Sequence, residues 1–359
     1  MRHLIGIEHL SAAELLQLLE SAEGMVEISS RELKKVPALR GKTIVNLFFE
    51  ASTRTRTSFE IAAKRLSADV INLSVSQSSV SKGETLFDTA RTLEAMAPDA
   101  IVVRHASSGV PDFLTRVLSR VAIVNAGDGM REHPTQALLD CLTLKQVFSE
   151  RCRSDSNASG ESPIKNALSG LKIAIVGDVL HSRVARSNVW AHLLLGNEVR
   201  LVGPATLLPK EFASAFTRTE DSGTRGTLQV THSLAEGIAG ADVVMCLRVQ
   251  TERLAQFFLP TLEEYSRTFG INEKLLARHA PQAVVLHPGP ANRGVEISSE
   301  VMDGPRSLVR HQVSNGIAVR MAVLFHSCTG PAVGAGGEEG ASAVAASPKA
   351  SVQSVGAQG

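Results

Sequence analysis

The sequence lacks the features that mark several broad classes of protein. Its 359 residues carry a formal net charge of +1, so no overall field attracts nucleic acid or an anionic membrane, and any anion site must be local. No apolar run reaches the length of a membrane span, and the N-terminus has no apolar core of a secretory signal. We therefore expect a cytoplasmic protein that binds neither nucleic acid nor a membrane.

The cysteine and histidine patterns of disulfide and metal proteins are also missing. The 11 histidines form no H-E-x-x-H or H-x-H motif, so we expect no metal and no cofactor. Reduced thiols in a cytosolic enzyme explain the cysteines better than disulfides or a metal site. The four cysteines are scattered and form no C-x-x-C pair: Cys141, Cys152, Cys246 and Cys328.

Short apolar segments alternate with helix-like segments along most of the chain. This alternation predicts an α/β fold with parallel sheets and right-handed crossovers. The predicted strands are 43–48, 69–74, 99–104, 121–124, 171–176, 198–203, 242–246 and 282–286. The predicted helices between them are 53–67, 85–97, 111–119, 134–149, 182–195 and 233–239.

A polar stretch near the middle of the chain predicts two α/β halves. Residues 151–170 are rich in Ser, Gly and charged side chains, which is typical of a surface loop after a long helix. A final helix predicted over 314–328 has one apolar face and is expected to return to the first half. Residues 329–359 contain mostly small residues, which predicts a disordered tail.

A Ser-Thr-Arg-Thr-Arg run at 52–56 follows the apolar segment 43–49 and opens a predicted helix. A helix N-terminus has unpaired N–H groups and a partial positive charge, and hydroxyls and guanidiniums there suit a phosphate dianion. The alternative is a capped helix with a solvated basic first turn. Because the helix dipole disfavours arginine at that position, we favour the anion site.

Further cations stand where a ligand is expected. Arg104 is the last residue of a predicted strand, and Arg183 and Arg248 each follow one. Ligands of open parallel sheets bind at the carboxyl ends of the strands. Lys82 lies in a Ser- and Gly-containing loop, for which a solvated surface lysine is the alternative interpretation. These residues suit the binding of polyanionic small molecules.

Later in the sequence, other polar groups could bind a carbonyl or amide ligand. His133 stands just before a helix opened by Pro134, and Gln136 points the same way one turn on. A simple helix cap is the alternative for His133. The His-Pro-Gly-Pro turn at 287–290 is rigid, exposes backbone carbonyls and can contain a cis X–Pro bond. With no obvious nucleophile or carboxylate pair, the set suits polarisation of a carbonyl rather than covalent or redox catalysis.

Several of these motifs together resemble the aspartate/ornithine carbamoyltransferase family, over about residues 3–328. The Arg-x-Gln at 248–250 and the Ser-x-x-x-Lys-Gly-Glu-Thr loop at 78–85 resemble the aspartate branch. The other motifs that carry the resemblance are Ser-Thr-Arg-Thr-Arg at 52–56, His-Pro-Thr-Gln at 133–136 and His-Pro-Gly-Pro at 287–290.

The resemblance implies two doubly wound domains joined by long helices. One, over 1–134 and completed by the helix 314–328, would bind carbamoyl phosphate, and the other, over 135–313, would bind aspartate. The implied activity transfers the carbamoyl group to the amine of L-aspartate, giving N-carbamoyl-L-aspartate and phosphate, the committed step of pyrimidine synthesis. No metal or cofactor is implied.

The resemblance also implies residue roles. Thr55, Arg104 and His133 would bind the carbamoyl oxygen, which gains negative charge as the amine attacks. The phosphate would be held by Ser52, Thr53, Arg54, Thr55 and Arg104. The carbamoyl NH2 would be held by Gln136 and by backbone carbonyls around Gly289 and Pro290.

Aspartate would be held by bidentate contacts to its two carboxylates from Arg183 and Arg248, with Gln250 supporting Arg248. Lys82 and Ser78 would come from a neighbouring subunit, which implies a homotrimer with shared active sites. No carboxylate in the motifs is placed as a base, so the departing phosphate is expected to take the proton of the amine. The run at 287–297 resembles members that assemble with dihydroorotase or an inactive relative, which would imply a dodecamer.

Three alternatives remain open from the sequence. Ornithine carbamoyltransferase would need a Cys in the His-x-x-Pro turn, and the charge of Lys82 would repel ornithine. A non-catalytic scaffold paralogue would be expected to have lost a phosphate-site arginine or His133, and neither is missing. A dinucleotide-binding oxidoreductase is disfavoured because the segment 173–187 lacks G-x-G-x-x-G.

Overall fold

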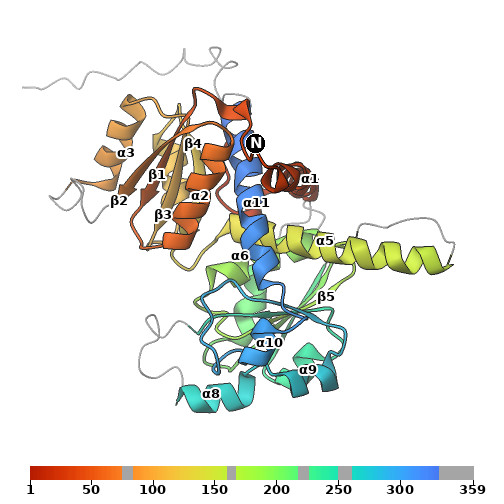
Figure 1. Ribbon diagram of the computed structural model, residues 1–359. Coiled ribbons are helices and arrows are strands. Elements are labelled where there is room, and N and C mark those ends of the chain that lie inside the picture. The colour runs from red at the N-terminus through yellow and green to blue at the C-terminus, as the bar shows by residue number, and fades with distance from the viewer. Residues whose placement is uncertain (75–83, 160–166, 217–225, 250–260, 331–359) are drawn as a thin grey trace, which may run out of the picture.

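The computed structural model describes residues 1–74, 84–159, 167–216, 226–249 and 261–330. Within them the chain forms two α/β bodies, each built on a parallel sheet, that lie one above the other in Figure 1. The predicted fold class is therefore confirmed. None of the described helices is long and apolar enough to cross a membrane.

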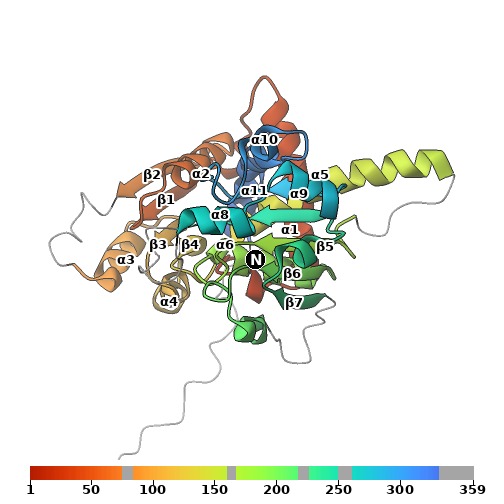
Figure 2. The same ribbon diagram turned by 90° about the horizontal axis from the view of Figure 1, so that it is seen from below.

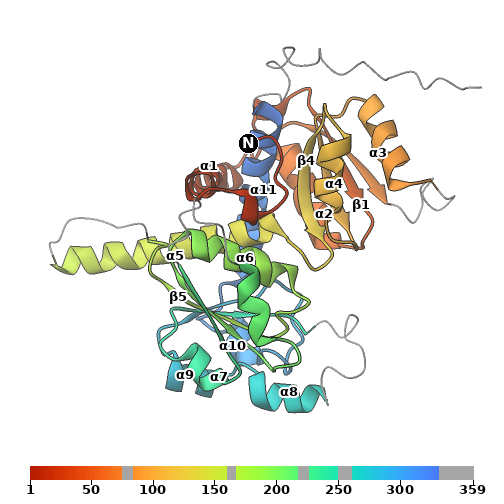
Figure 3. The ribbon, with the colours of Figure 1, turned by 180° about the vertical axis from the view of Figure 1, so that it is seen from behind.

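The first body contains a four-stranded sheet with the strand order β2-β1-β3-β4. The side chains of β1, β3 and β4 alternate between two buried faces, which explains why these strands are mostly apolar. The edge strand β2 is more exposed and more polar. The helices α3 and α4 cover one face, as Figure 3 shows from behind, and α2 and α11 cover the other. The strands are β1 (Thr43–Phe48), β2 (Asp69–Ser74), β3 (Ala100–His105) and β4 (Ala122–Asp128).

The second body contains a five-stranded parallel sheet with the order β7-β6-β5-β8-β9. The order reverses direction at β5, and a topological switch of this kind opens a crevice at the carboxyl ends of the strands. The strands are β5 (Lys172–Val176), β6 (Glu198–Val202), β7 (Thr227–Thr231), β8 (Val243–Cys246) and β9 (Val284–Leu286).

The helices of the described chain begin with α1, whose N-cap Ser11 forms a capping box with Glu14. Short 3-10 turns occur at η1 (Ile7–His9), η2 (Pro37–Leu39) and η5 (Lys210–Phe216). The α-helices are α1 (Ala12–Ser30), α2 (Thr53–Arg65), α3 (Leu86–Ala95), α4 (Val110–Val117), α5 (Pro134–Ser159), α6 (Arg183–Leu194), α7 (Leu234–Ile238), α8 (Leu262–Phe269), α9 (Glu273–His279), α10 (Ser299–Asp303) and α11 (Val309–Thr329).

Two helices connect the bodies. The α11 helix starts beside β9 and runs up against α1, α2 and α5, which confirms the expected return of the last helix to the first half. The α5 helix leaves the first body after β4 and packs on α6 of the second. Because both helices span the junction, residues at their first turns can face a site between the two sheets.

Several elements differ from the sequence-based prediction. The segment 151–170 was predicted as a loop from its first residue, but α5 continues to Ser159 and projects from the body in Figures 1 and 2. Residues 151–159 contain neither Gly nor Pro, so nothing stops the helix before Gly160. The edge strand β7 and the helices α8, α9 and α10 were missed because they are short and polar.

Candidate active site

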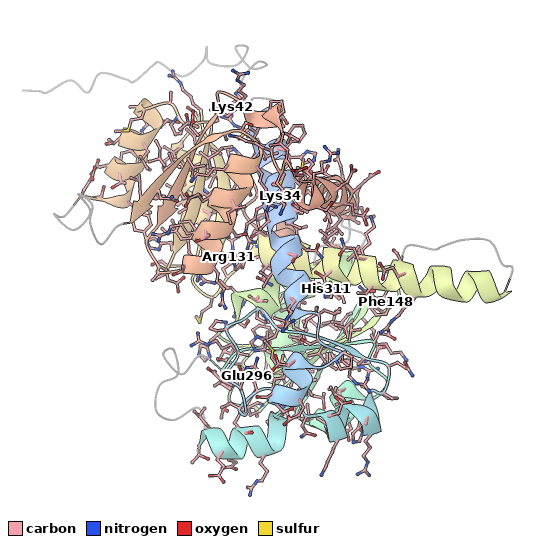
Figure 4. All side chains as sticks on the ribbon, viewed as in Figure 1. Lys34, Lys42, Arg131, Phe148, Glu296 and His311 are labelled. Carbon is pink, nitrogen blue, oxygen red and sulfur yellow. The ribbon has the colours of Figure 1, made fainter. Side chains whose placement is uncertain are left out.

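The carboxyl ends of the strands in the first body face the second body. Lys42, just before β1, lies at the far end of the first body in Figure 4, whereas Arg131, after β4, lies at the junction. A cleft of about 990 Å³ opens at this junction. It is lined by Arg104 at the end of β3, by residues that follow β1, β4, β5, β8 and β9, and by residues of α2, α5 and α11.

The cleft brings together most of the residues singled out in the sequence. Lys82, Gln250 and Ser78 lie outside the described residues. The predicted site residues that line the cleft are Ser52, Thr53, Arg54, Thr55, Arg104, His133, Gln136, Arg183, Arg248, Gly289 and Pro290.

The start of α2 presents its backbone to the cleft. Ser52 is the N-cap, yet its side chain accepts no capping hydrogen bond, which leaves the hydroxyl and the first N–H groups available to a ligand. Burial, and then the charge of Arg248, lower the pKa of Arg54. The positive charges of Arg54 in the first body and Arg248 in the second body are therefore close enough to repel each other. Such an arrangement is expected of a site that binds anions.

The Gly289–Pro290 bond is cis, and Gly289 has a φ of +62°. A Cβ built on Gly289 would lie 3.0 Å from Nη1 of Arg54. Glycine at this position therefore lets the turn approach the start of α2 without a side chain between them.

Glu50 is a site residue that the sequence analysis missed. Its Oε2 accepts from Nη2 of Arg183 at 2.7 Å and lies 3.0 Å from Nε of Arg104. One carboxylate thus joins two arginines of different bodies inside a cluster of positive charge. The one available signal was its position, directly between β1 and the Ser-Thr-Arg-Thr-Arg run.

His133 is buried directly before α5. Burial, and then the charges of Arg104, Arg183 and Arg320, lower its pKa well below the usual value. Its imidazole is therefore neutral near pH 7 and can donate one hydrogen bond. Among the residues that the structure describes, Nδ1 of this buried ring has no hydrogen-bond partner.

The backbone of His133 is fixed by a chain of buried contacts. Its N–H donates to Oγ of Ser187 on α6 at 2.8 Å, and this hydroxyl donates to Glu132 at 2.5 Å. Glu132 also accepts from the backbone N–H groups of Ile7 and Glu8 at 3.0 and 3.1 Å. Burial raises the pKa of Glu132 to about 7.

Two further residues of the cleft, Gln312 and Arg320, come from α11. Arg320 is buried, with Nη1 donating to Oγ of Ser58 at 3.0 Å, and burial lowers its pKa to about 10. Gln312 was missed because it lies before the predicted helix 314–328, and Arg320 because that helix was considered only for its apolar face. Within the described chain, no group of three His, Cys, Asp or Glu side chains could hold a metal ion.

The arrangement combines a helix start, several guanidiniums and one neutral imidazole around a common space. Such a site can bind a phosphate and two carboxylates, and it can stabilise negative charge that develops on a carbonyl oxygen. It offers no nucleophile beside a base among the cleft residues.

Two family models match the chain. Residues 2–146 match "Aspartate/ornithine carbamoyltransferase, carbamoyl-P binding domain", and residues 169–327 match "Aspartate/ornithine carbamoyltransferase, Asp/Orn binding domain". Residues 147–168, which neither model matches, comprise the projecting part of α5 and the residues after it.

Curated proteins and solved structures that resemble the chain belong to the same family as the two models. The chain is 51% identical over 332 residues to the aspartate carbamoyltransferase catalytic subunit of Magnetococcus marinus, covering 92% of this chain and 94% of that one. It is similar, with a TM-score of 0.76 and 30% identity, to aspartate transcarbamoylase of Trypanosoma cruzi in complex with carbamoyl phosphate and aspartate, covering 90% and 96% of the two chains. It is also similar to ornithine carbamoyltransferase of Pyrococcus furiosus, with a TM-score of 0.74, 28% identity, and 90% and 96% coverage.

Proposed function

The chain belongs to the aspartate/ornithine carbamoyltransferase family, and we propose that it transfers the carbamoyl group of carbamoyl phosphate to the amine of L-aspartate. The products are N-carbamoyl-L-aspartate and phosphate, as in the first committed step of pyrimidine synthesis. The observation that carries the proposal is the convergence of Arg54, Arg104, Arg183 and Arg248 on a cleft that also contains the neutral imidazole of His133. Carbamoyl phosphate carries a phosphate and aspartate carries two carboxylates, so the positive charge of the cleft matches these anionic groups.

The aspartate branch is favoured over the ornithine branch by sequence rather than by fold. Solved structures of both enzymes resemble the chain to a similar extent, with TM-scores of 0.76 and 0.74. Two relatives that are more than 50% identical to the chain over most of its length are aspartate carbamoyltransferase catalytic subunits. The two guanidiniums of Arg183 and Arg248 in the cleft also suit the carboxylates of aspartate better than the ammonium of ornithine.

Carbamoyl phosphate is assigned to the first body and the start of α2. Its phosphate would accept hydrogen bonds from Ser52, Thr53, Arg54 and Thr55, and from the free N–H groups of the first turn. Arg104, at the end of β3, would reach both the phosphate and the carbamoyl oxygen. The carbamoyl NH2 would face Gln136 and the carbonyls of the Gly289–Pro290 turn.

The proposed reaction is nucleophilic attack of the amine of aspartate on the carbamoyl carbon. A C–N bond forms, the carbonyl oxygen gains negative charge, and the bond from carbon to the phosphate oxygen then breaks. Thr55, Arg104 and His133 would stabilise the oxygen, His133 as a neutral donor because its pKa lies well below the usual value. The departing phosphate takes the proton of the amine, so no side chain is assigned as base.

Aspartate is assigned to the second body. Arg183 begins α6 and Arg248 follows β8, so both come from the carboxyl ends of the second sheet, and each would bind one carboxylate. Gln250 is proposed to support Arg248. Lys82 is proposed to be catalytic and to contact aspartate.

We also propose a homotrimer in which Lys82 and Ser78 of one subunit complete the site of the next. The resemblance of the loop at 78–85 to the family pattern supports this. A larger dodecamer with dihydroorotase, or with an inactive relative of it, is proposed from the run at 287–297. Size-exclusion of the endogenous protein tests this assembly, and a bare trimer would contradict it.

The domain division is proposed at 134/135, with a carbamoyl phosphate-binding domain over residues 1–134 that the helix 314–328 completes, and an aspartate-binding domain over residues 135–313. Gln136 and the Gly289–Pro290 turn would reach the carbamoyl group from the second domain. A cytoplasmic location is proposed as well. The buried thiols of Cys141 and Cys246, which form no disulfide, are consistent with a reducing compartment.

The test is formation of a ureido product from purified protein, carbamoyl phosphate and aspartate, with each substrate omitted in turn. Product that requires both substrates supports the proposal. No product would favour a scaffold protein, which remains the alternative from another functional class.

A further inference from the structure

Asp140 is a buried carboxylate beside the cleft to which no role has been given. It lies on α5, one turn after Gln136, and its side chain is fully buried. Burial raises its pKa to about 6, while its hydrogen-bond donors and the charge of Arg320 act in the opposite direction. These donors favour the ionised form of the carboxyl against the effect of burial.

Three amide side chains from three helices donate to this carboxylate. Oδ1 accepts from Nε2 of Gln136 at 2.9 Å and from Nε2 of Gln312 at 2.7 Å, and Oδ2 accepts from Nδ2 of Asn188 at 2.9 Å. An ionised carboxylate can only accept hydrogen bonds. Each amide must therefore turn its NH2 group toward Asp140 and its carbonyl oxygen elsewhere.

For Gln136 this fixes which atom is available in the cleft. Gln136 lines the cleft, and its NH2 group is held by Asp140, so Oε1 is the amide atom left for a ligand. An oxygen accepts from the NH2 of a carbamoyl group, whereas an amide NH2 turned into the cleft would meet it donor to donor.

For Gln312 the same logic extends to the His-Pro-Gly-Pro turn. With its NH2 group held by Asp140, Oε1 of Gln312 accepts from the backbone N–H of His287 at 3.0 Å. Nδ1 of His287 in turn accepts from the N–H of Gly289 at 2.8 Å. Asp140 is thus connected through one amide to the turn that carries the Gly289 and Pro290 carbonyls.

We infer that Asp140 is a positioning residue that sets the two acceptors of the carbamoyl NH2, the amide oxygen of Gln136 and the carbonyls of the Gly289–Pro290 turn. This inference rests on the proposed function. It assigns to Asp140 the discrimination between a carbamoyl group and an acyl group of the same shape without NH2.

The test is Asp140→Asn, which keeps the shape but has only one acceptor oxygen for three amide donors. Equilibrium binding is measured by calorimetry without aspartate, for carbamoyl phosphate and for acetyl phosphate, which has a methyl group in place of the NH2. We expect the Kd of carbamoyl phosphate to rise about 10- to 100-fold, as for the loss of hydrogen bonds to a charged group. The Kd of acetyl phosphate should remain near that of the wild type.

Asn188→Ala is the matched control. Asn188 donates to Asp140 and to the carbonyl of Val184, but it has no hydrogen bond to Gln136 or to the turn. We expect this variant to keep the wild-type ratio of the Kd of carbamoyl phosphate to that of acetyl phosphate, even where its melting temperature changes.

A second variant covers the case in which Asp140→Asn does not fold. Gln312→Met removes the bond to the N–H of His287 but leaves Gln136 on Asp140, so the Kd of carbamoyl phosphate should rise about tenfold and that of acetyl phosphate should not. Equal weakening of both ligands, or of neither, would overturn the inference. Absence of product in the wild type, with carbamoyl phosphate still bound in preference to acetyl phosphate, would instead contradict the proposed function.

Discussion

Replacing Glu50 by Gln tests whether the cleft depends on the contact between its two halves. In the structure one carboxylate holds Arg183 at 2.7 Å and Arg104 at 3.0 Å. The side chains of Arg183, Arg104 and Glu50 are 8%, 11% and 26% exposed. These are therefore partly buried charge-assisted contacts rather than surface ion pairs.

The expected magnitude follows from these contacts. A hydrogen bond to a charged group contributes about 1.5–3 kcal/mol, and the exposure of Glu50 favours the lower end. The hydrogen bond from Arg183 and the ion pair with Arg104 together amount to about 2–3 kcal/mol, which is about a 30- to 150-fold loss in kcat/KM for aspartate. The loss is expected because, without the carboxylate, the guanidiniums of Arg104 and Arg183 repel each other and leave their positions around the substrates.

The assay is steady-state kinetics with aspartate varied at saturating carbamoyl phosphate. Glu23→Gln is the matched control, because Glu23 pairs with Lys145 at 2.8 Å outside the residues that line the cleft. This control should keep kcat/KM within about a factor of three, because a comparable ion pair is lost at a place where neither residue lines the cleft. A Glu50→Gln enzyme with nearly wild-type kcat/KM would refute the reasoning, as would an equal loss in the control.

Three further predictions concern the site and its support. His133→Gln should lower kcat strongly, because the neutral donor to the carbamoyl oxygen is lost or displaced, and full turnover in this variant would contradict the role given to His133. Burial raises the pKa of Glu132 from 4.5 to about 7, so the folded protein holds a proton that the unfolded chain releases between these values. The contribution of Glu132 to stability is thus fully present below about pH 4.5 and is lost as the pH rises through 7, by about 3 kcal/mol in total. Urea unfolding at several pH values should show a clearly smaller slope in Glu132→Gln than in the wild type, because Asp140, whose pKa burial raises to about 6, still contributes in the variant. Equal slopes would be contrary evidence. Finally, Lys82→Ala and Arg54→Ala should each abolish activity, whereas mixed trimers of the two should regain part of it, and no regain on mixing would exclude a shared site.

The sequence predicted the parts of the fold that depend on local patterns. Buried parallel strands such as β1 and β3 are recognisable because both faces are covered, so that nearly every residue is apolar. The polar edge strand β7 and the short helix α10 lack such a pattern, and their positions are set by packing against the rest of the second body. The end of α5 was predicted too early because a polar composition was taken for a loop, although no residue there stops a helix.

The candidate site was predictable where side chains stand at strand ends and helix starts. Arg104 and His133 could be found in this way, since the carboxyl ends of parallel strands meet at one edge. The contact of Asp140 with Gln312 joins residues 172 positions apart, and no local pattern indicates it. Glu50 was also missed, because a carboxylate is not expected in an anion site until the arginines around it are seen.

The most direct test of the central claim is amine specificity. Purified protein and carbamoyl phosphate are incubated in parallel with aspartate or with ornithine, and the ureido product is measured colorimetrically. We predict product with aspartate alone. Product with ornithine would contradict the assignment of Arg183 and Arg248 to the carboxylates of aspartate.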